Sequence, residues 1–162
     1  MNIRVTAKYV DDFVRVLKQA PAIAIRNWAL AMMAAVTKVK THARQNHKFI
    51  WRTGKLERAI TGKVDAGTSG ALTGKVYINT GQAGAPYGPI VHEGSKPHII
   101  KPKPGHKMLK WPTPNGFVWA KLVRHPGTKP DQFIYEAGEA NKDAVQALFE
   151  KYTLRALKEA GL

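Results

Sequence analysis

Glycine and proline interrupt the chain repeatedly between Tyr87 and Phe133, and this stretch constrains the fold more than any other. The apolar pieces between these interruptions are short: Ile99–Ile100, Met108–Trp111 and Phe117–Ala120. Short apolar runs separated by turn-forming residues are typical of strands joined by tight turns. The stretch therefore predicts three short strands connected by rigid loops.

The same stretch is strongly basic. From Gly94 to Pro130 there is no Asp or Glu, while there are seven lysines, one arginine and three histidines. The whole chain of 162 residues has a formal net charge of +15. Self-repulsion of that size opposes compaction unless a polyanion or an acidic protein lies nearby. Nucleic acid or an acidic protein neighbour is therefore the first partner to consider.

A long helical pattern precedes this region, from about Ala22 to Phe49. Apolar residues recur along it at spacings of three and four, which indicates one buried helix face. A shorter helical segment opens at Asp11–Asp12, and Pro21 is expected to end or kink it. Residues 1–7 alternate in polarity and predict a short strand or an ordered arm. The apolar stripe comprises Ile25, Ala29, Met32, Val36, Val39 and Ala43.

Lys40, Arg44 and Lys48 form a basic row at every fourth position beside that stripe. Residues at this spacing share one face of a helix. The row has two interpretations, because it either presents charge to DNA or an acidic partner, or forms an ordinary solvated face. The sequence leaves both open.

The remaining segments complete an α+β fold. Thr53 is a candidate cap for a short turn that carries Leu56 and Ile60, and 131–162 keeps helical spacing to its end. We expect one domain over 1–162, mainly helical over 1–60, with a small and mostly antiparallel sheet over 61–123 and a C-terminal helix over 131–162 packed on that sheet. The middle segments are a strand entering a glycine-rich loop (62–70), its return strand (72–78) and a helical turn (87–93).

No residue pattern points to catalysis. The chain has no cysteine, which excludes disulfides, cysteine zinc sites and a cysteine nucleophile. Four histidines lie within 34 residues, but no spacing matches a metal-ligand signature and Glu93 is the one carboxylate among them. We therefore expect no enzyme, metal or cofactor, and the histidines are expected to bond loop backbones. They are His92, His98, His106 and His125.

Two further patterns bear on partners. Trp51, Trp111 and Trp119 have basic neighbours and could stack on bases, although the alternating pattern around the last two favours core packing. The longest apolar run, Trp28 to Val36, has nine residues, far below the roughly 20 that span a bilayer. We expect neither a signal peptide nor a membrane partner.

Two motifs carry a resemblance to a known family. Glu93-Gly94 is followed by Pro97-His98, and downstream the chain reads Arg124-His-Pro-Gly-Thr-Lys-Pro130. With the Thr53-Gly-Lys-Leu turn and the order of elements, these motifs resemble the small neck and tail-completion proteins of tailed bacteriophages. The resemblance implies that the motif residues maintain the fold and the subunit contacts. They are His92, Glu93, Gly94, Pro97, His98, Arg124, His125, Pro126, Gly127, Thr128, Pro130 and Phe133.

The resemblance implies a structural virion protein, assembled in the host bacterial cytoplasm as a homo-oligomeric ring, a hexamer, around the DNA channel at the head–tail junction. Its implied partners are neighbouring neck, connector, tail-terminator or tail-tube proteins. Its basic contacts, with DNA or with an adjacent ring, are expected from Lys40, Arg44 and Lys48 or from Lys101, Lys103 and Lys107. The glycine-rich segment from Gly62 to Gly74 departs from the family pattern like an insertion, and could reach a neighbour.

Two other hypotheses remain open from the sequence. One is a free, monomeric nucleic-acid-binding protein that acts in solution. Steeply salt-dependent binding by a monomer would favour it. The other is a metal-dependent nuclease built on the histidines. Metal-stimulated cleavage of plasmid that is lost in His92→Ala or His125→Ala would favour that one.

Overall fold

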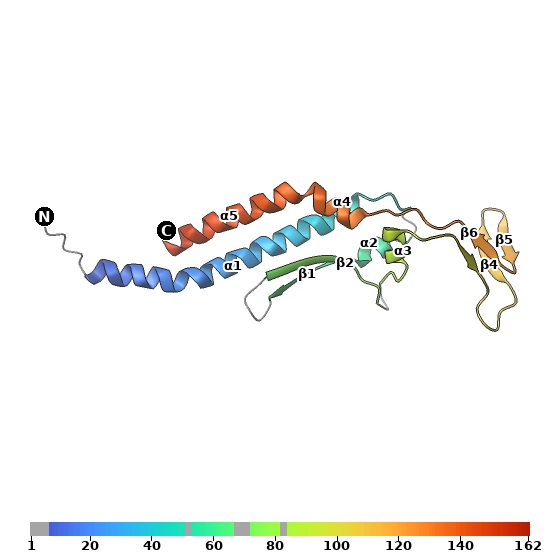
Figure 1. Ribbon diagram of the computed structural model, residues 1–162, viewed down its shortest axis with the longest axis horizontal. Helices are drawn as coiled ribbons and strands as arrows, with labels where there is room; N and C mark the ends of the chain where they lie inside the picture. Colours follow the sequence, from blue (N-terminus) through green and yellow to red (C-terminus); the bar gives the residue numbers. More distant parts are fainter. Residues whose placement is uncertain (1–6, 51–52, 67–71, 82–83) are drawn as a thin grey trace.

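A computed structural model describes residues 7–50, 53–66, 72–81 and 84–162, with side chains from Lys18 onward. The fold is α+β, with a long N-terminal helix, three two-stranded antiparallel sheets and C-terminal helices (Figure 1). Its elements are α1 (Ala7–Gln45), α2 (Lys55–Ala59), β1 (Ile60–Ala66), β2 (Leu72–Ile78), α3 (Gly88–Glu93), β3 (His98–Ile100), β4 (Leu109–Thr113), β5 (Gly116–Ala120), β6 (Val123–His125), α4 (Phe133–Ala140) and α5 (Lys142–Ala160).

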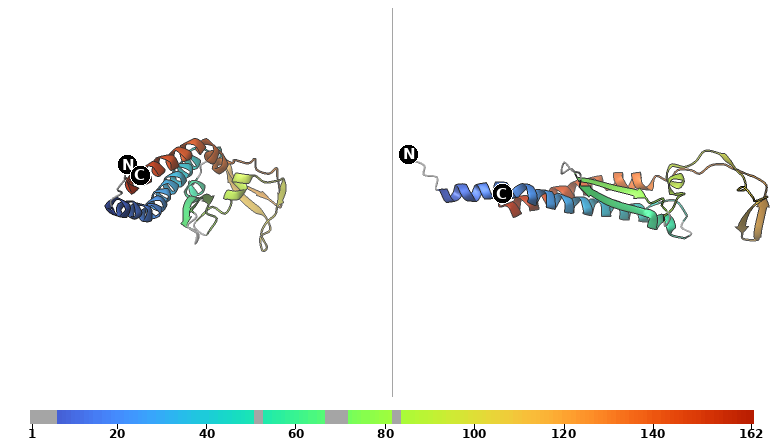
Figure 2. Two further views of the ribbon diagram at one scale, coloured as in Figure 1. Left: turned by 60° about the vertical axis from the view of Figure 1, so that its left-hand side comes forward. Right: turned by 90° about the horizontal axis from the view of Figure 1, so that it is seen from below.

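Helix α1 is a single helix of 39 residues that continues through Pro21. The sequence predicted two helical segments that meet near Pro21, and the break between them is wrong, because one helix spans both. Helix α1 also ends at Gln45 rather than at Phe49. Proline removes one backbone hydrogen bond and crowds the preceding turn, which bends a helix when the turns on both sides persist. Figures 1 and 2 show α1 bending within its blue first half. The strand expected over 1–7 falls outside the described residues, apart from Ala7 at the start of α1.

The hairpin β1–β2 lies along α1 and touches it through glycines. The return strand predicted over Leu72–Ile78 is confirmed, and it pairs with β1 from Ile60↔Ile78 to Ala66↔Leu72. A Cβ at Gly62 would lie 2.4 Å from Val36 Cγ1, and one at Gly74 would lie 2.5 Å from Met32 Sδ. These glycines let the strands approach the helix closely. The strand predicted from Gly62 onward is confirmed as part of β1, and residues 67–71, in the loop predicted after it, lie outside the described residues.

The main core forms where α1, β1 and α4 meet. Ile60 and Phe133 are fully buried there, with Ala43 and Ala137 beside them. Phe133 starts α4, so the C-terminal helical region reaches the β1–β2 sheet through this helix. The longer helix α5 continues from Asn141 along α1 (Figure 2). We call α1, α2, β1, β2, α3, α4 and α5 together the body.

By length and composition alone, a 28-residue part of α1, Lys18–Gln45, is long and apolar enough to cross a membrane. In the structure this part packs against α5, β1 and β2, with Ala31, Ala35 and Ala43 buried. The small buried residues of this helical segment therefore belong to the protein core. The nine-residue run noted in the sequence underestimates this helix, because isolated charges interrupt the longer apolar stretch.

Glu159, near the C-terminal end of α5, links this helix to α1. Its carboxylate accepts hydrogen bonds from Asn27 Nδ2 at 2.9 Å, from Arg155 Nε at 2.8 Å and from the Arg26 guanidinium. These bonds hold the charged form, and they lower the pKa of Glu159 to about 2. Trp28 Nε1 adds a bond to Thr153 Oγ1 at 3.0 Å.

Glu159 should make the stability of the protein depend on pH. Because its pKa is lower in the folded state than in the unfolded chain, its contribution is present above pH 4.5 and is lost as the pH falls toward 2. We expect Glu159→Gln to melt at a lower temperature than the wild type at pH 7, and the difference to shrink by pH 2. Thermal melts followed by circular dichroism at both pH values measure it. A difference that does not change with pH would contradict the assignment.

Candidate functional site

Residues 94–130 project from one end of the body, and we call them the β arm (Figure 1). In it β3 pairs with β6 and β4 pairs with β5, both antiparallel. Three strands were predicted here and β6 was missed, because Val123–His125 reads as the start of a rigid turn. Every residue of the arm is described and none is buried. Figures 1 and 2 show it standing clear of α1 and α5.

The two sequence motifs lie side by side at the base of the arm, where they form what we call the stalk, residues 94–100 and 123–130. Ser95 and Thr128 bridge the two segments, with Ser95 N–H donating to Thr128 O at 2.9 Å and Thr128 N–H donating to Ser95 O at 3.1 Å. Above this bridge, His98 pairs with His125 and Ile99 with Arg124. The motifs therefore build one structural unit that connects the arm to the body.

Two glycines make the stalk possible. Gly94 has φ +78° and Gly127 has φ +93°, the left-handed region that other residues rarely adopt. A Cβ at Gly94 would lie 2.7 Å from Thr128 O, and one at Gly127 would lie 2.2 Å from Ser95 O. Each glycine thus meets both a conformational and a steric requirement, which explains why the motifs contain glycine at these positions.

Bonding to loop backbone, which was predicted for all four histidines, is confirmed for the two in the stalk and is wrong for His92, which bonds to the Glu93 side chain. His125 Nδ1 accepts a hydrogen bond from Gly127 N–H at 3.1 Å, and His98 Nδ1 lies 2.9 Å from Lys96 O. Their rings face each other with centroids 5.0 Å apart. His92 is buried in the body instead, and His106 is exposed in the loop after β3. Within the described residues, no group of three His, Asp or Glu side chains could hold a metal ion.

The stalk is anchored in the body by the residues at its two ends. His92, on α3, bonds to the Glu93 carboxylate at 2.8 Å and packs edge-on against Phe133 and Tyr135. At the other end, buried Asp131 accepts the backbone N–H groups of Lys48 and Phe49 on one oxygen, both at 2.7 Å.

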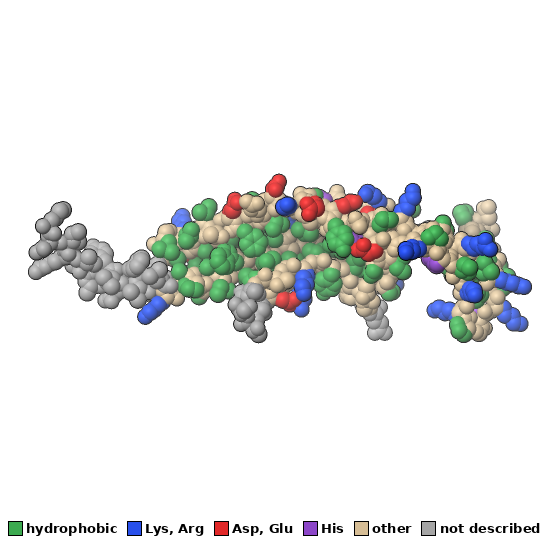
Figure 3. Space-filling view, viewed as in Figure 1, with side chains coloured by type: hydrophobic (Ala, Val, Ile, Leu, Met, Phe, Trp, Pro, Cys, Tyr) green, Lys and Arg blue, Asp and Glu red, His purple; other side chains and the backbone are tan. Residues whose placement is uncertain are grey.

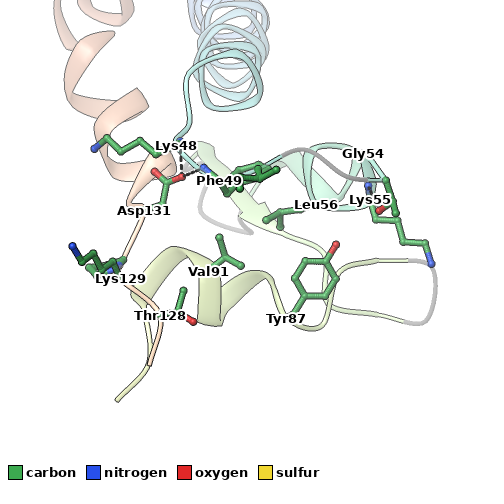
Figure 4. A pocket seen from close by; sticks show the side chains of 13 residues that line it. Lys48, Phe49, Gly54, Lys55, Leu56, Tyr87, Val91, Thr128, Lys129 and Asp131 are labelled. Atoms are coloured by element: carbon green, nitrogen blue, oxygen red, sulfur yellow. Dashed lines mark hydrogen bonds between the residues drawn. The ribbon is translucent and has the colours of Figure 1, made fainter. Parts of the chain in front are cut away.

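Figure 4 shows these two hydrogen bonds of Asp131 beside a groove of about 860 Å³, which Leu56, Tyr87 and Val91 help to line. The backbone N–H of Asp131 donates to Val91 O at 3.1 Å. Asp131 therefore joins the end of α1 and helix α3 to the start of α4. Sequence reasoning did not single it out, although an acidic residue directly after the second motif was a visible signal.

The outer face of β4–β5 is aromatic. The pairs Lys110↔Trp119 and Pro112↔Phe117 place these four side chains on one face of the hairpin. Phe117 is 60% exposed and Trp119 55%. Lys110 Nζ lies 4.1 Å from the Phe117 ring centroid and 4.7 Å from that of Trp119, within cation–π range.

The core positions predicted for Trp111 and Trp119 are wrong, since both side chains are at least 36% exposed. Alternation identified the strands correctly, but nothing in the described part of the chain covers this hairpin. Trp51 lies outside the described residues. Large aromatic side chains are thus exposed together on a projecting hairpin.

The basic side chains divide between two places. Lys101, Lys103 and Lys107 are exposed in the loop between β3 and β4, and Figure 3 shows lysine and arginine gathered over the arm. The other predicted set, Lys40, Arg44 and Lys48, lies in the body.

Two members of the body set bond to other parts of the body. Arg44 donates to the carbonyl of Ile60 at 2.7 Å and to that of Arg58 at 3.3 Å. Lys48 follows the end of α1, and its hydrogen bond with Glu136 at 2.9 Å raises the pKa of Lys48. The charge of this row is therefore partly neutralised or oriented inward, and Lys40 is half-buried.

Comparisons of the chain with protein-family models, with curated proteins and with solved structures find no match. The resemblance to phage neck proteins therefore rests on the sequence motifs and on the order of the elements alone.

Proposed function

We propose that the protein is a structural subunit of a tailed-phage virion, which forms an oligomeric ring around the DNA channel at the head–tail junction and is needed to join or finish the tail. The observation that carries this proposal is the β arm, a basic segment of 37 residues with no buried side chain. The arm stands on a stalk built from the motif residues of the resemblance. No catalytic role is assigned to any residue.

The arm requires a partner for energetic reasons. Ordering its backbone costs roughly 1–2 kcal/mol per residue, and an isolated two-stranded hairpin is marginally stable in water. Burial offsets such a cost by about 25 cal/mol for each Å² of apolar surface, but the arm leaves Phe117 and Trp119 open. Contact with another protein supplies the missing burial. A subunit that is completed by assembly fits a virion ring.

The charge of the arm fits a place beside DNA. Seven lysines and one arginine, with no acidic residue, give it a formal charge of +8. Lysine contacts with phosphates neutralise the DNA backbone without reading sequence, which suits a channel through which a whole genome passes. Lys101, Lys103 and Lys107 are the candidates for such contacts, or for contacts with an acidic neighbouring ring. The other partners we propose are further copies of this chain, in a hexamer, and adjacent neck, connector, tail-terminator or tail-tube proteins.

A free nucleic-acid-binding protein is the alternative, and the exposed aromatic side chains of the arm favour it. Trp111, Phe117 and Trp119 lie among lysines, and such groups bind single strands by stacking and charge. The two functions differ in oligomeric state. A monomer that binds single-stranded DNA with steep salt dependence would support the alternative.

Deleting the gene from its phage tests the proposal directly. We expect electron microscopy of the lysate to show filled heads and separate tails, because the junction is incomplete. Intact, infectious virions would overturn the proposal. A rescue plasmid that carries the wild-type gene is the matched control, since it should restore joined particles.

The double variant Phe117→Ala, Trp119→Ala should separate assembly from folding. Both side chains are exposed in the monomer, so we expect its melting temperature to change little, by less than about 3 °C. Sedimentation velocity should show loss of the oligomer at the same time. Tyr77→Ala, which removes an exposed ring from β2 in the body, is the control and should keep the oligomer. An intact oligomer in the double variant would contradict this role of the arm.

A further inference from the structure

We propose that the β arm of one protomer docks on the α4–α5 junction, residues 131–146, of a second copy of the chain. This inference rests on the proposed ring, and it names the surface that receives the arm. It assigns the exposed aromatic face of β4–β5 and the acidic junction to one heterologous interface.

A surface that binds the arm has to meet two requirements at once. It has to cover the rings of Phe117 and Trp119, and it has to bring negative charge to a segment that has none of its own. Lys110 already lies over both rings, so its ammonium group occupies π faces on which a base would stack. A protein surface that combines carboxylates with small apolar side chains meets both requirements better than a nucleotide does.

The α4–α5 junction of this chain has that chemistry. Residues 131–146 contain four acidic residues and one lysine. Asp131 is buried and Glu136 pairs with Lys48, so the carboxylates that the junction offers to a partner are those of Glu139 and Asp143. Glu139 and Asp143 are exposed, and neither pairs with another described residue. Ala140 and Ala147 are exposed near them and present little steric obstacle. Figure 3 shows the acidic side chains along the edge formed by α4 and α5, away from the arm.

Within one protomer, the arm points away from the α4–α5 junction. Figures 1 and 2 show the arm extending from the end of the body, in the direction opposite to α5. Because the arm and the junction are different surfaces, their contact between copies is heterologous. Contacts of this kind repeat from copy to copy, and they close into a ring when the rotation between neighbours permits.

Reciprocal charge reversal tests the docking. The arm variant carries Lys107→Glu and Lys121→Glu, at two exposed lysines just before β4 and just after β5. The junction variant carries Glu139→Lys and Asp143→Lys. Each variant alone places like charges across every interface, so we expect its association to weaken by about tenfold or more. In an equal mixture, an arm of either kind meets a junction of opposite charge, and we expect association to return toward the wild-type level. Sedimentation velocity at about 0.1 M salt measures all three samples.

The control reverses two exposed lysines of the body, Lys55→Glu and Lys75→Glu, and it should leave association unchanged. If the arm variant does not fold, Trp119→Ser replaces it, and we then expect loss of association with an unchanged melting temperature. Full association of the junction variant, or no recovery in the mixture, would overturn the docking site.

The outcomes separate this inference from the proposed function. If the wild type forms rings and the junction variant associates equally well, the docking surface is overturned and the ring function still stands. A wild type that stays monomeric at all concentrations would overturn both. If that monomer also binds a single-stranded DNA probe that the arm variant does not bind, nucleic acid is the occupant of the arm.

Discussion

Asp131→Ala is expected to lower the free energy of unfolding by about 4 kcal/mol, the largest effect we predict for a single side chain. One carboxylate oxygen accepts the backbone N–H groups of both Lys48 and Phe49 at 2.7 Å in a buried position. Alanine would leave two buried donors without a partner where the chain leaves α1. The melting temperature should fall by roughly 10 °C, which thermal denaturation measures.

Asp131→Asn is the matched control. The amide oxygen can take the place of the carboxylate oxygen and keep both bonds, although without the charge that strengthens them. We expect it to lose less than half as much stability as Asp131→Ala. An alanine variant that melts within 1–2 °C of the wild type would show that Asp131 does not hold the end of α1 in solution.

Gly127→Ala is expected to open the stalk while leaving the body folded. The new Cβ would lie 2.2 Å from Ser95 O, and φ +93° is costly for alanine by itself, by about 1–2 kcal/mol. The Ser95–Thr128 bridge cannot form at that separation. Hydrogen exchange should therefore speed up at the amides of Ser95 and Thr128 by at least about a hundredfold, while α1 and α5 keep their protection.

Gly105→Ala is the control that separates the conformational part of this effect from the steric part. Gly105 has a similar φ of +87°, but a Cβ there meets nothing within 4 Å. We expect it to carry the conformational cost alone and to leave exchange in the stalk nearly unchanged. Equal effects of the two substitutions would mean that backbone conformation, rather than the close approach to Ser95, makes Gly127 necessary.

Local patterns in the sequence predict most of the elements. The α+β class, the strand Leu72–Ile78 and the helical turn at α3 follow from alternation and from glycine and proline positions. The boundaries of α1 do not follow, because the cost of Pro21 is local and the helical turns on both sides of it persist. The patterns also do not predict how the strands pair, because the structure has three separate pairs of strands in place of the expected single sheet.

The candidate site shows the same division. The motifs identify residues that come together in the stalk, because glycine, proline and histidine at fixed positions reflect local backbone demands. The exposure of Trp119 could not be predicted, since a strand pattern does not say whether another element will cover the face. Arg44 and Lys48 illustrate a further limit, because their partners, Ile60 O and Glu136, depend on tertiary contacts.

The bridge between Ser95 and Thr128 gives the chain the topology of a domain insertion. The arm leaves and re-enters the body at adjacent points, so its sequence can lengthen, shorten or diverge without moving α3 away from α4. Because the arm contributes no buried side chain to the core, such changes would cost the body little stability. The stalk therefore separates the part of the chain that builds the core from the part whose side chains all stay at the surface.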